Sequence, residues 1–281
     1  FLYPRVKQWN LFYRDLIFIE QERRIQRQFS DFSCTLGAVA ASQVEKESEA
    51  LLSIQNLTFQ PTYSSQPVLS SISLNIQRGE LVVIMGRTGS GKSVLCYAIN
   101  GLVPQFVQGT FRGSVMVDGH PTTKTPVWEQ ANRVGMVFQD FETQLVSTNV
   151  ETELRYALES QEGLSRELDE ASIRQHIKEV LGLVGLAGLE RSDPFSLSGG
   201  QRQRLVMASV LVREPQVLVM DKPLTDLDPV GRRTFIHLLK ILNKKGITIL
   251  IVEHAVEDLL HADQVLSLIH ISEPTRRSAI S

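Results

Sequence analysis

A glycine-rich segment between residues 86 and 93 carries the strongest chemical signal in the chain. It reads Gly86-Arg87-Thr88-Gly89-Ser90-Gly91-Lys92-Ser93, and glycines at this spacing before a Lys-Ser pair are typical of a loop that cradles phosphates. Lys92 can reach β- and γ-phosphates, and the Ser93 hydroxyl can ligate Mg²⁺. A glycine-rich turn without a ligand is the alternative. Because an apolar run precedes the segment and a helical pattern follows it, we predict a nucleotide phosphate site here.

A second segment also has the residues to bind an anion. It reads Leu197-Ser198-Gly199-Gly200-Gln201, followed by Arg202-Gln203-Arg204 and an apolar helical stretch. Ser198, two glycine amides and a helix start can grip a phosphate, although such a segment can also be an ordinary helix cap. The segment is identical to the signature motif of ATP-binding-cassette (ABC) proteins, and about residues 50–265 resemble an ABC nucleotide-binding domain. In that family the motif grips the ATP held by a partner domain.

The resemblance implies roles for four further polar residues, which occur in the family's order. Gln139 matches the glutamine that senses Mg²⁺ and the γ-phosphate, and Asp221 matches the carboxylate that holds Mg²⁺. Asp228 lies in a segment that resembles the family's D-loop and is expected to bind the nucleotide, and His254 matches the histidine that contacts the γ-phosphate. The resemblance therefore implies ATP and Mg²⁺ as ligands and ATP hydrolysis as the reaction.

Adenine would stack on an aromatic ring. Tyr63 is the best candidate for this role and Phe59 is the second, although either ring can instead pack on a sheet.

One residue departs from the family pattern. Where ABC ATPases have Asp-Glu-Pro, this chain has Asp221-Lys222-Pro223. The missing glutamate would polarise the attacking water, and loss of a general base typically slows a reaction about 10²–10⁴-fold. An ammonium beside the γ-phosphate can still help to bind ATP, so we expect binding to survive better than hydrolysis. A single-base error in a glutamate codon is the other explanation of Lys222.

The residues after Gln139 narrow the resemblance. The segment 140–148, followed by Val150, Glu151 and Glu153, is most similar to ATPases of energy-coupling-factor importers and of cobalt or nickel importers. This similarity implies a transmembrane partner subunit, a second ABC domain (homodimer, heterodimer or fused tandem) and a peripheral position on the cytoplasmic face of the membrane. The rival hypothesis is a soluble ABC ATPase that acts on ribosomes or DNA.

The pattern of apolar residues predicts the elements that position these motifs. The predicted strands cover 52–59, 69–76, 81–85, 115–117, 134–138, 217–220 and 247–252, and the predicted helices cover 92–100, 198–212 and 232–244, with helical character over 148–189. Strands that alternate with helices predict an α/β fold with a mostly parallel sheet. As a P-loop NTPase core, it would carry an antiparallel β subdomain and a helical subdomain at about 145–210 that bears the signature.

The two ends of the chain depart from this pattern. Residues 1–50 are aromatic, then charged, then small and polar, and we expect an extension or linker of uncertain nature. Residues 266–276 are what the adapter end of a transposon-based sequencing library encodes. We therefore expect the ABC domain to cover 51–265 without the family's last strand, and we expect residues 266–281 to be non-native and poorly packed.

Composition limits the classes of partner. The 42% hydrophobic and 21% charged residues are ordinary for a globular domain, and a net charge of −2 gives no reason to expect nucleic acid as a partner. No apolar run approaches the roughly 20 residues of a membrane helix, so a membrane role would come through a partner. Cys34 and Cys96 have no metal-ligand spacing, which fits a reducing compartment.

Overall fold

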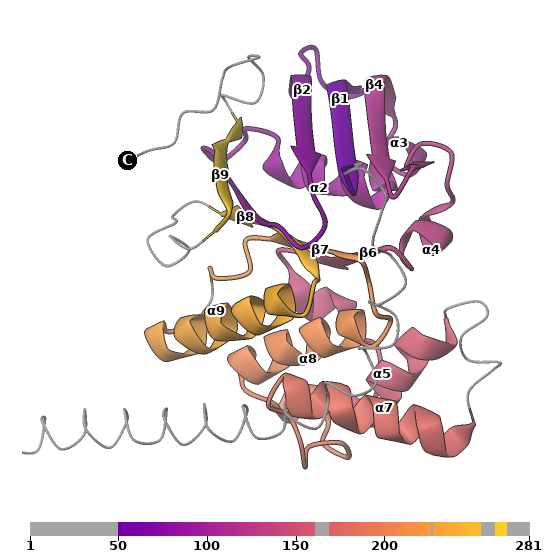
Figure 1. Cartoon of the computed structure of the whole chain (residues 1–281), viewed down its shortest axis with the longest axis vertical. Helices are drawn as coiled ribbons and strands as arrows, with labels where there is room; N and C mark the ends of the chain where they lie inside the picture. Colours follow the sequence, from indigo (N-terminus) through magenta and orange to yellow (C-terminus); the bar gives the residue numbers. More distant parts are fainter. Residues whose placement is uncertain (1–49, 161–168, 226, 254–261, 269–281) are drawn as a thin grey trace, which may run out of the picture.

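The computed structural model describes residues 50–160, 169–225, 227–253 and 262–268. Its strands are β1 (Leu52–Pro61), β2 (Leu69–Ile76), β3 (Leu81–Met85), β4 (Gly109–Val117), β5 (His120–Pro121), β6 (Val134–Val137), β7 (Val217–Asp221), β8 (Thr248–Glu253) and β9 (Gln264–Ser267). Its helices are α2 (Lys92–Asn100), α3 (Leu102–Gln105), α4 (Val127–Gln130), η1 (Phe141–Gln144), α5 (Val150–Glu159), α7 (Glu170–Leu183), η2 (Pro194–Ser196), α8 (Gly199–Leu211) and α9 (Pro229–Lys244). In Figure 1, strands β2, β1 and β4 lie at the top, and helices α9, α8, α5 and α7 lie below the sheet that contains β7 and β8.

The strands form two sheets. One is antiparallel in the order β2-β1-β4-β5, and the other is parallel in the order β6-β7-β8-β3-β9. The carboxyl ends of the parallel strands lie at one edge of their sheet. Asp221 at the end of β7 pairs with Val252 of β8, and Met85 at the end of β3 pairs with Glu253. The segments that follow β3, β6, β7 and β8 therefore leave the sheet side by side. The predicted α/β fold with an antiparallel subdomain is confirmed.

The apolar strands of the parallel sheet are buried on both faces. In β3, Leu81 and Val83 belong to the core shared with α5, α7, α8 and α9, while Val82 and Ile84 belong to the core shared with α2 and the antiparallel sheet. Side chains alternate along a strand, so one continuous apolar run supplies both cores. This arrangement explains why these strands read as uninterrupted apolar sequence.

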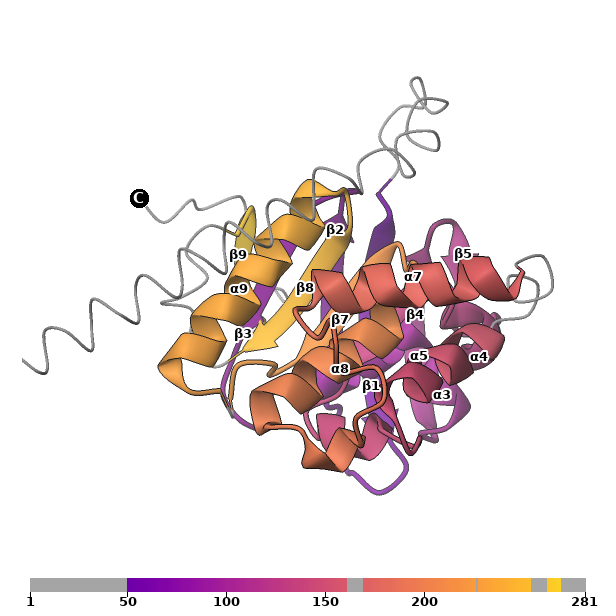
Figure 2. The ribbon, with the colours of Figure 1, turned by 90° about the horizontal axis from the view of Figure 1, so that it is seen from below.

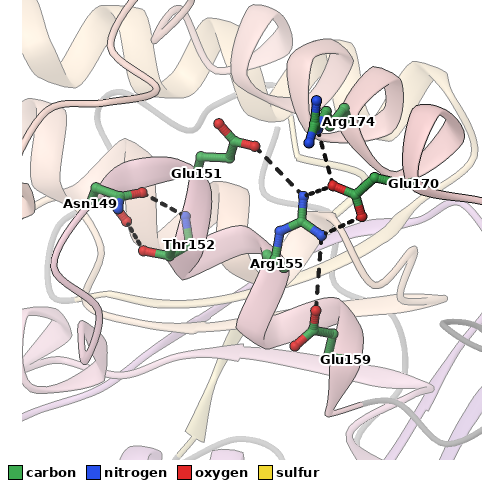
Figure 3. A network of polar contacts seen from close by, with 7 residues as sticks. All are labelled: Asn149, Glu151, Thr152, Arg155, Glu159, Glu170 and Arg174. Atoms are coloured by element: carbon green, nitrogen blue, oxygen red, sulfur yellow. Dashed lines mark hydrogen bonds and ion pairs between the residues drawn. The ribbon is translucent and has the colours of Figure 1, made fainter.

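Helices α5, α7 and α8 lie below the parallel sheet and fall within the segment of about 145–210 that was predicted to be helical. Helix α7 buries an apolar stripe that comprises Ile173, Ile177, Val180 and Leu181. A polar network joins α5 to α7: Arg155 donates to both carboxylate oxygens of Glu170 at 2.9 and 2.8 Å, and Arg174 donates to Glu170 at 3.0 Å (Figure 3). Figure 2 shows α5 and α7 alongside α8, which carries the signature segment at its start.

Two element starts differ from the prediction by more than one residue. Helix α9 begins at Pro229 rather than 232, because the Asp228 side chain caps it and proline suits its first turn. Strand β4 begins at Gly109 rather than 115, because its first half also pairs with β1. Gly113 interrupts the sequence pattern there with a φ of 86°, and a Cβ at this residue would come within 2.4 Å of the Gln55 carbonyl oxygen.

The carboxyl-terminal boundary also differs from the prediction. Leu266 and Ser267 lie in β9, where they pair with Ile84 and Met85 of β3, and Leu268 is buried. The expectation that all residues from 266 pack poorly is therefore wrong for residues 266–268, because the edge of β3 accepts a fifth strand and two leucines cover it. Residues 1–49 and 269–281 lie outside the described ranges. Within those ranges, no helix combines the length and apolar character needed to cross a membrane.

Candidate functional site

The glycine-rich loop (residues 86–93) connects the end of β3 to the start of α2, and its backbone favours glycine at two positions. Gly89 and Gly91 have φ values of 81° and 90°, in the left-handed region that disfavours other residues. A Cβ on Gly91 would also lie 2.6 Å from the carbonyl oxygen of Val68. The loop is thus held closely against the start of β2. Arg87, Thr88 and Gly89 are exposed, and Ser90 and Ser93 are half-buried.

Lys92 is the most confined charge in this loop. Its side chain is only 4% exposed, and its Nζ donates to the carbonyl oxygens of Gly86 at 2.6 Å and Arg87 at 2.8 Å. Burial lowers the pKa of Lys92, and the positive charge of Lys222 lowers it further. The ammonium is paired with neutral oxygens rather than with a carboxylate. A phosphate could replace these carbonyl oxygens and would bind the ammonium more strongly.

Asp221 offers a ligand to a cation. It is 1% exposed at the end of β7, and its Oδ1 has no hydrogen-bond partner among the described residues. Its charge contributes to the raised pKa of Cys96, after burial itself, so the carboxylate lies near α2, the helix whose first turn holds Ser93. Buried carboxylate oxygens are rarely left without a partner. A carboxylate and a hydroxyl are hard oxygen ligands, so Asp221 and Ser93 fit Mg²⁺.

Lys222 and Gln139 meet at this edge of the sheet. The Lys222 Nζ donates to the Gln139 Oε1 at 2.8 Å. Lys222 has a φ of 52°, and its backbone N–H donates to the Val252 carbonyl oxygen at 2.8 Å. Its backbone is therefore fixed against β8. The structure thus brings the predicted residues that follow β6 and β7, Gln139 and Lys222, into contact.

The signature segment (residues 197–201) forms hydrogen bonds within itself and has free space beside Gly199. The Ser198 Oγ accepts from the Gln201 N–H at 3.3 Å, and the Gln201 Oε1 accepts from the Ser198 N–H at 2.9 Å. This reciprocal capping box starts α8, so Ser198 does cap a helix. A Cβ on Gly199 would meet no atom within 4 Å. Packing within the described residues therefore does not require a glycine at this position.

Three contacts around the site were missed in the sequence. Arg202 pairs with Glu142 at 2.8 Å and so joins the signature helix to the segment after Gln139. The Gln203 side-chain amide donates to the Pro223 carbonyl oxygen. Glu253 is buried, and its Oε1 accepts from the Leu224 N–H at 2.8 Å. Only the position of Gln203 inside the motif-bearing helix hinted at any of them.

The remaining predicted residues are placed as follows. Tyr63 is 80% exposed in the loop between β1 and β2, whose far end contacts Gly91. Phe59, the second candidate for adenine stacking, is fully buried against Phe111 and is excluded by its burial. The Asp228 carboxylate accepts from the Gly231 N–H at 2.9 Å and caps α9. His254 lies outside the described residues.

Comparison with known proteins agrees with this geometry. The family model described as "ABC transporter" matches residues 69–225. A putative ABC transporter ATP-binding protein of Caldanaerobacter subterraneus is 42% identical over 217 residues, which make up 76% of this chain but only 37% of that protein. A counterpart in Pyrococcus abyssi is 41% identical over 218 residues, or 77% of this chain and 76% of that protein.

Two solved structures have the same fold. One is cbiO1 of Clostridium perfringens, described as part of the ABC transporter complex cbiONQ, with a TM-score of 0.68 at 31% identity over 79% of this chain and 85% of that one. The other is the dimeric cassette MJ0796 bound to ADP and Pi, with a TM-score of 0.68 at 26% identity over 82% and 99% of the two chains. With the family model, the relatives and the fold in agreement, this chain belongs to the ABC transporter ATP-binding family and is an ABC ATPase domain.

Proposed function

We propose that this chain is the ATP-binding subunit of an importer of the energy-coupling-factor type and that it acts on the cytoplasmic face of a membrane. The similarity to cbiO1, itself described as part of a transporter complex, supports the importer class. The segment 140–153 supports the same class by its sequence. A transmembrane partner would select the substrate.

The nucleotide part of the proposal depends on Lys92, whose ammonium bonds to carbonyl oxygens, and on the buried Asp221 Oδ1, which has no hydrogen-bond partner among the described residues. Residues 86–91 would wrap the phosphates with backbone N–H groups, and Lys92 would exchange the Gly86 and Arg87 carbonyls for β- and γ-phosphate oxygens. Tyr63 would stack on adenine. Ser93, Gln139 and Asp221 would hold Mg²⁺, which when bound neutralises charge on the phosphates.

A second ABC domain would complete each site. The open side of Gly199, next to Ser198 at the start of α8, leaves room for an anionic group from outside this chain. We propose that Ser198, Gly199, Gly200 and Gln201 contact the γ-phosphate of an ATP bound by the partner domain, with Asp228 at the dimer interface and His254 facing the phosphate in its own chain. The dimer reported for MJ0796 is consistent with this arrangement.

Lys222 makes slow hydrolysis part of the proposal. Its ammonium cannot accept a proton from water while it is charged, so the site lacks the general base that a carboxylate would provide. ATP binding would survive, because a further positive charge faces the phosphates. When paired with a domain that has a glutamate at this position, the composite site built on the partner's glycine-rich loop would remain active.

The segment after Gln139 would transmit closure to the membrane partner. Glu153 is buried on α5, and its Oε2 accepts from the backbone N–H groups of Val146 at 3.0 Å and Ser147 at 2.8 Å. Val146 and Tyr156 nevertheless expose most of their apolar side chains. This segment is thus fixed to the helical subdomain while it presents apolar surface to a partner.

The test is equilibrium binding of ATP to the Lys92→Ala variant. We expect affinity to fall at least about 10²-fold, because the variant removes a buried cation that would face two phosphates. Lys124→Ala, at an exposed lysine outside the site, is the matched control and should bind as the unaltered chain does. Equal affinity for all three proteins would refute the nucleotide site.

A further inference from the structure

The contact between Lys222 and Gln139 involves an atom that the proposed site assigns to a metal. The amide oxygen of Gln139 would ligate Mg²⁺, yet here it accepts a hydrogen bond from the Lys222 ammonium at 2.8 Å. An ammonium group and a divalent cation compete for the same oxygen lone pairs. In this structure the Gln139 amide oxygen is therefore bonded to the Lys222 ammonium.

The backbone holds Lys222 in the position from which it makes this contact. Its φ of 52° turns the chain sharply at the end of β7, and its N–H is bonded to Val252 of β8. The residue immediately before it is Asp221, whose buried Oδ1 has no partner among the described residues. The ammonium of Lys222 is thus tethered beside the carboxylate that would hold the metal.

The charges at this edge are already unusual for a metal site. Lys92 follows β3 and Lys222 follows β7, so both ammonium groups lie at the same carboxyl edge of the parallel sheet. Both ammonium groups would attract a triphosphate and would repel a divalent cation. Lys222 would therefore favour ATP binding, as Mg²⁺ does, and would weaken the binding of Mg²⁺ itself.

We propose that the Lys222 ammonium takes over part of the role of Mg²⁺ in this chain, so that ATP binding depends little on the metal. Lys222 would remain near Gln139 and contact the terminal phosphate, and Gln139 would be a weaker metal ligand than its counterpart in a site without this lysine. The inference rests on the proposed nucleotide site and adds a property that the site would not have with a glutamate or a neutral residue at position 222.

The experiment measures the dissociation constant of a non-hydrolysable ATP analogue with Mg²⁺ and with EDTA. For the unaltered chain we expect the two constants to differ less than about threefold. For Lys222→Met, which keeps a similar length without the charge, the constant in EDTA should exceed that in Mg²⁺ by about tenfold or more. Lys222→Arg keeps the charge and should behave as the unaltered chain does, as should Lys124→Met, the matched control outside the site.

The outcomes separate this inference from the proposed function. Tight binding of the unaltered chain only with Mg²⁺ overturns the inference, as does an equal metal dependence of the unaltered chain and Lys222→Met. No binding by the unaltered chain in either condition refutes the nucleotide site instead. Thermal unfolding of each variant verifies that it folds, and Lys222→Gln replaces Lys222→Met if the latter does not.

Discussion

The charges between helices α5 and α7 differ in their partners from the charges at the carboxyl edge of the parallel sheet. Arg155 contacts Glu151, Glu159 and Glu170, so every charged side chain in that network faces an opposite charge (Figure 3). At the sheet edge, Lys92 and Lys222 bond to neutral oxygens. The comparison separates charges that hold two helices together from charges that are available to a ligand.

Reversing the charge at Lys222 should give the largest effect on activity. If Lys222 takes the place of the general base, Lys222→Glu should raise steady-state phosphate release roughly 10²-fold or more. The unaltered homodimer should bind ATP but hydrolyse it very slowly. A mixed dimer with a domain that has the glutamate should have one active site, and its rate should lie between those of the two homodimers.

Lys124→Glu is the control for this experiment, because it makes the same charge change at an exposed residue outside the site. Its rate should equal that of the unaltered chain. Equal and rapid turnover by the unaltered chain and Lys222→Glu would show that residue 222 is not at the catalytic position. The proposed role of Asp221 would then also need revision.

A larger side chain at Gly199 should weaken dimerisation without lowering the stability of the folded chain. A Cβ at Gly199 would meet no atom within 4 Å among the described residues, and leucine has a higher helix propensity than glycine, so the thermal midpoint of Gly199→Leu should not fall. The added side chain would occupy the space proposed for the partner's phosphate, and ATP-dependent dimerisation should weaken by about tenfold or more. Light scattering after size-exclusion chromatography measures the dimer.

Lys178→Leu controls for the effect of adding a leucine to an exposed helical surface. It should leave ATP-dependent dimerisation unchanged. If Gly199→Leu dimerised as well as this control, the signature segment would not face a partner's nucleotide.

Removing a charge from the α5–α7 network should give the smallest effect. The hydrogen bond from Arg155 holds the pKa of Glu170 below its ordinary value, so its stabilising contribution is present above that value and is lost as pH falls through the folded-state pKa. Glu170→Gln should lower the thermal midpoint only by about 1–2 °C at pH 7, because the pair is solvent-exposed. The difference from the unaltered chain should vanish once the pH is below the folded-state pKa of Glu170, where the carboxyl group is protonated.

Glu159→Gln is the matched control, since Glu159 lies 4.0 Å from Arg155 rather than 2.8 Å. Its midpoint should change less than that of Glu170→Gln. A constant difference for Glu170→Gln across the whole pH range would mean that the carboxylate charge does not matter.

The sequence predicted best what depends on neighbouring residues. The bounds of α2, the buried strands β3 and β7 and the capping box at Ser198 all follow from local patterns. Contacts such as Arg202 with Glu142 join segments far apart in the chain, and no local pattern specifies them. Strand β9 was missed because its residues were interpreted from their coding sequence rather than from the free edge of β3 that they cover.

Some misses had a usable signal. Asp228 before Pro229 is a capping residue before a proline, and this pair marks the start of α9. Phe59 lies on the same face of β1 as the buried Leu57 and pairs with Phe111 of β4, so its burial follows from strand alternation. The Lys222 to Gln139 contact had no such signal, because it depends on the positive φ of Lys222.

The division of β3 between two cores has a consequence for how the domain melts. Val83 belongs to the core on the helical side and Val82 to the core around α2, although the two residues are adjacent in one strand. If either core came apart, β3 would lose its fixed position in the sheet, and the other core would lose the packing that β3 provides. The domain should therefore unfold in one cooperative transition. A ligand held by the loop after β3 would shift that single transition as a whole, and heat would not release the helical side independently.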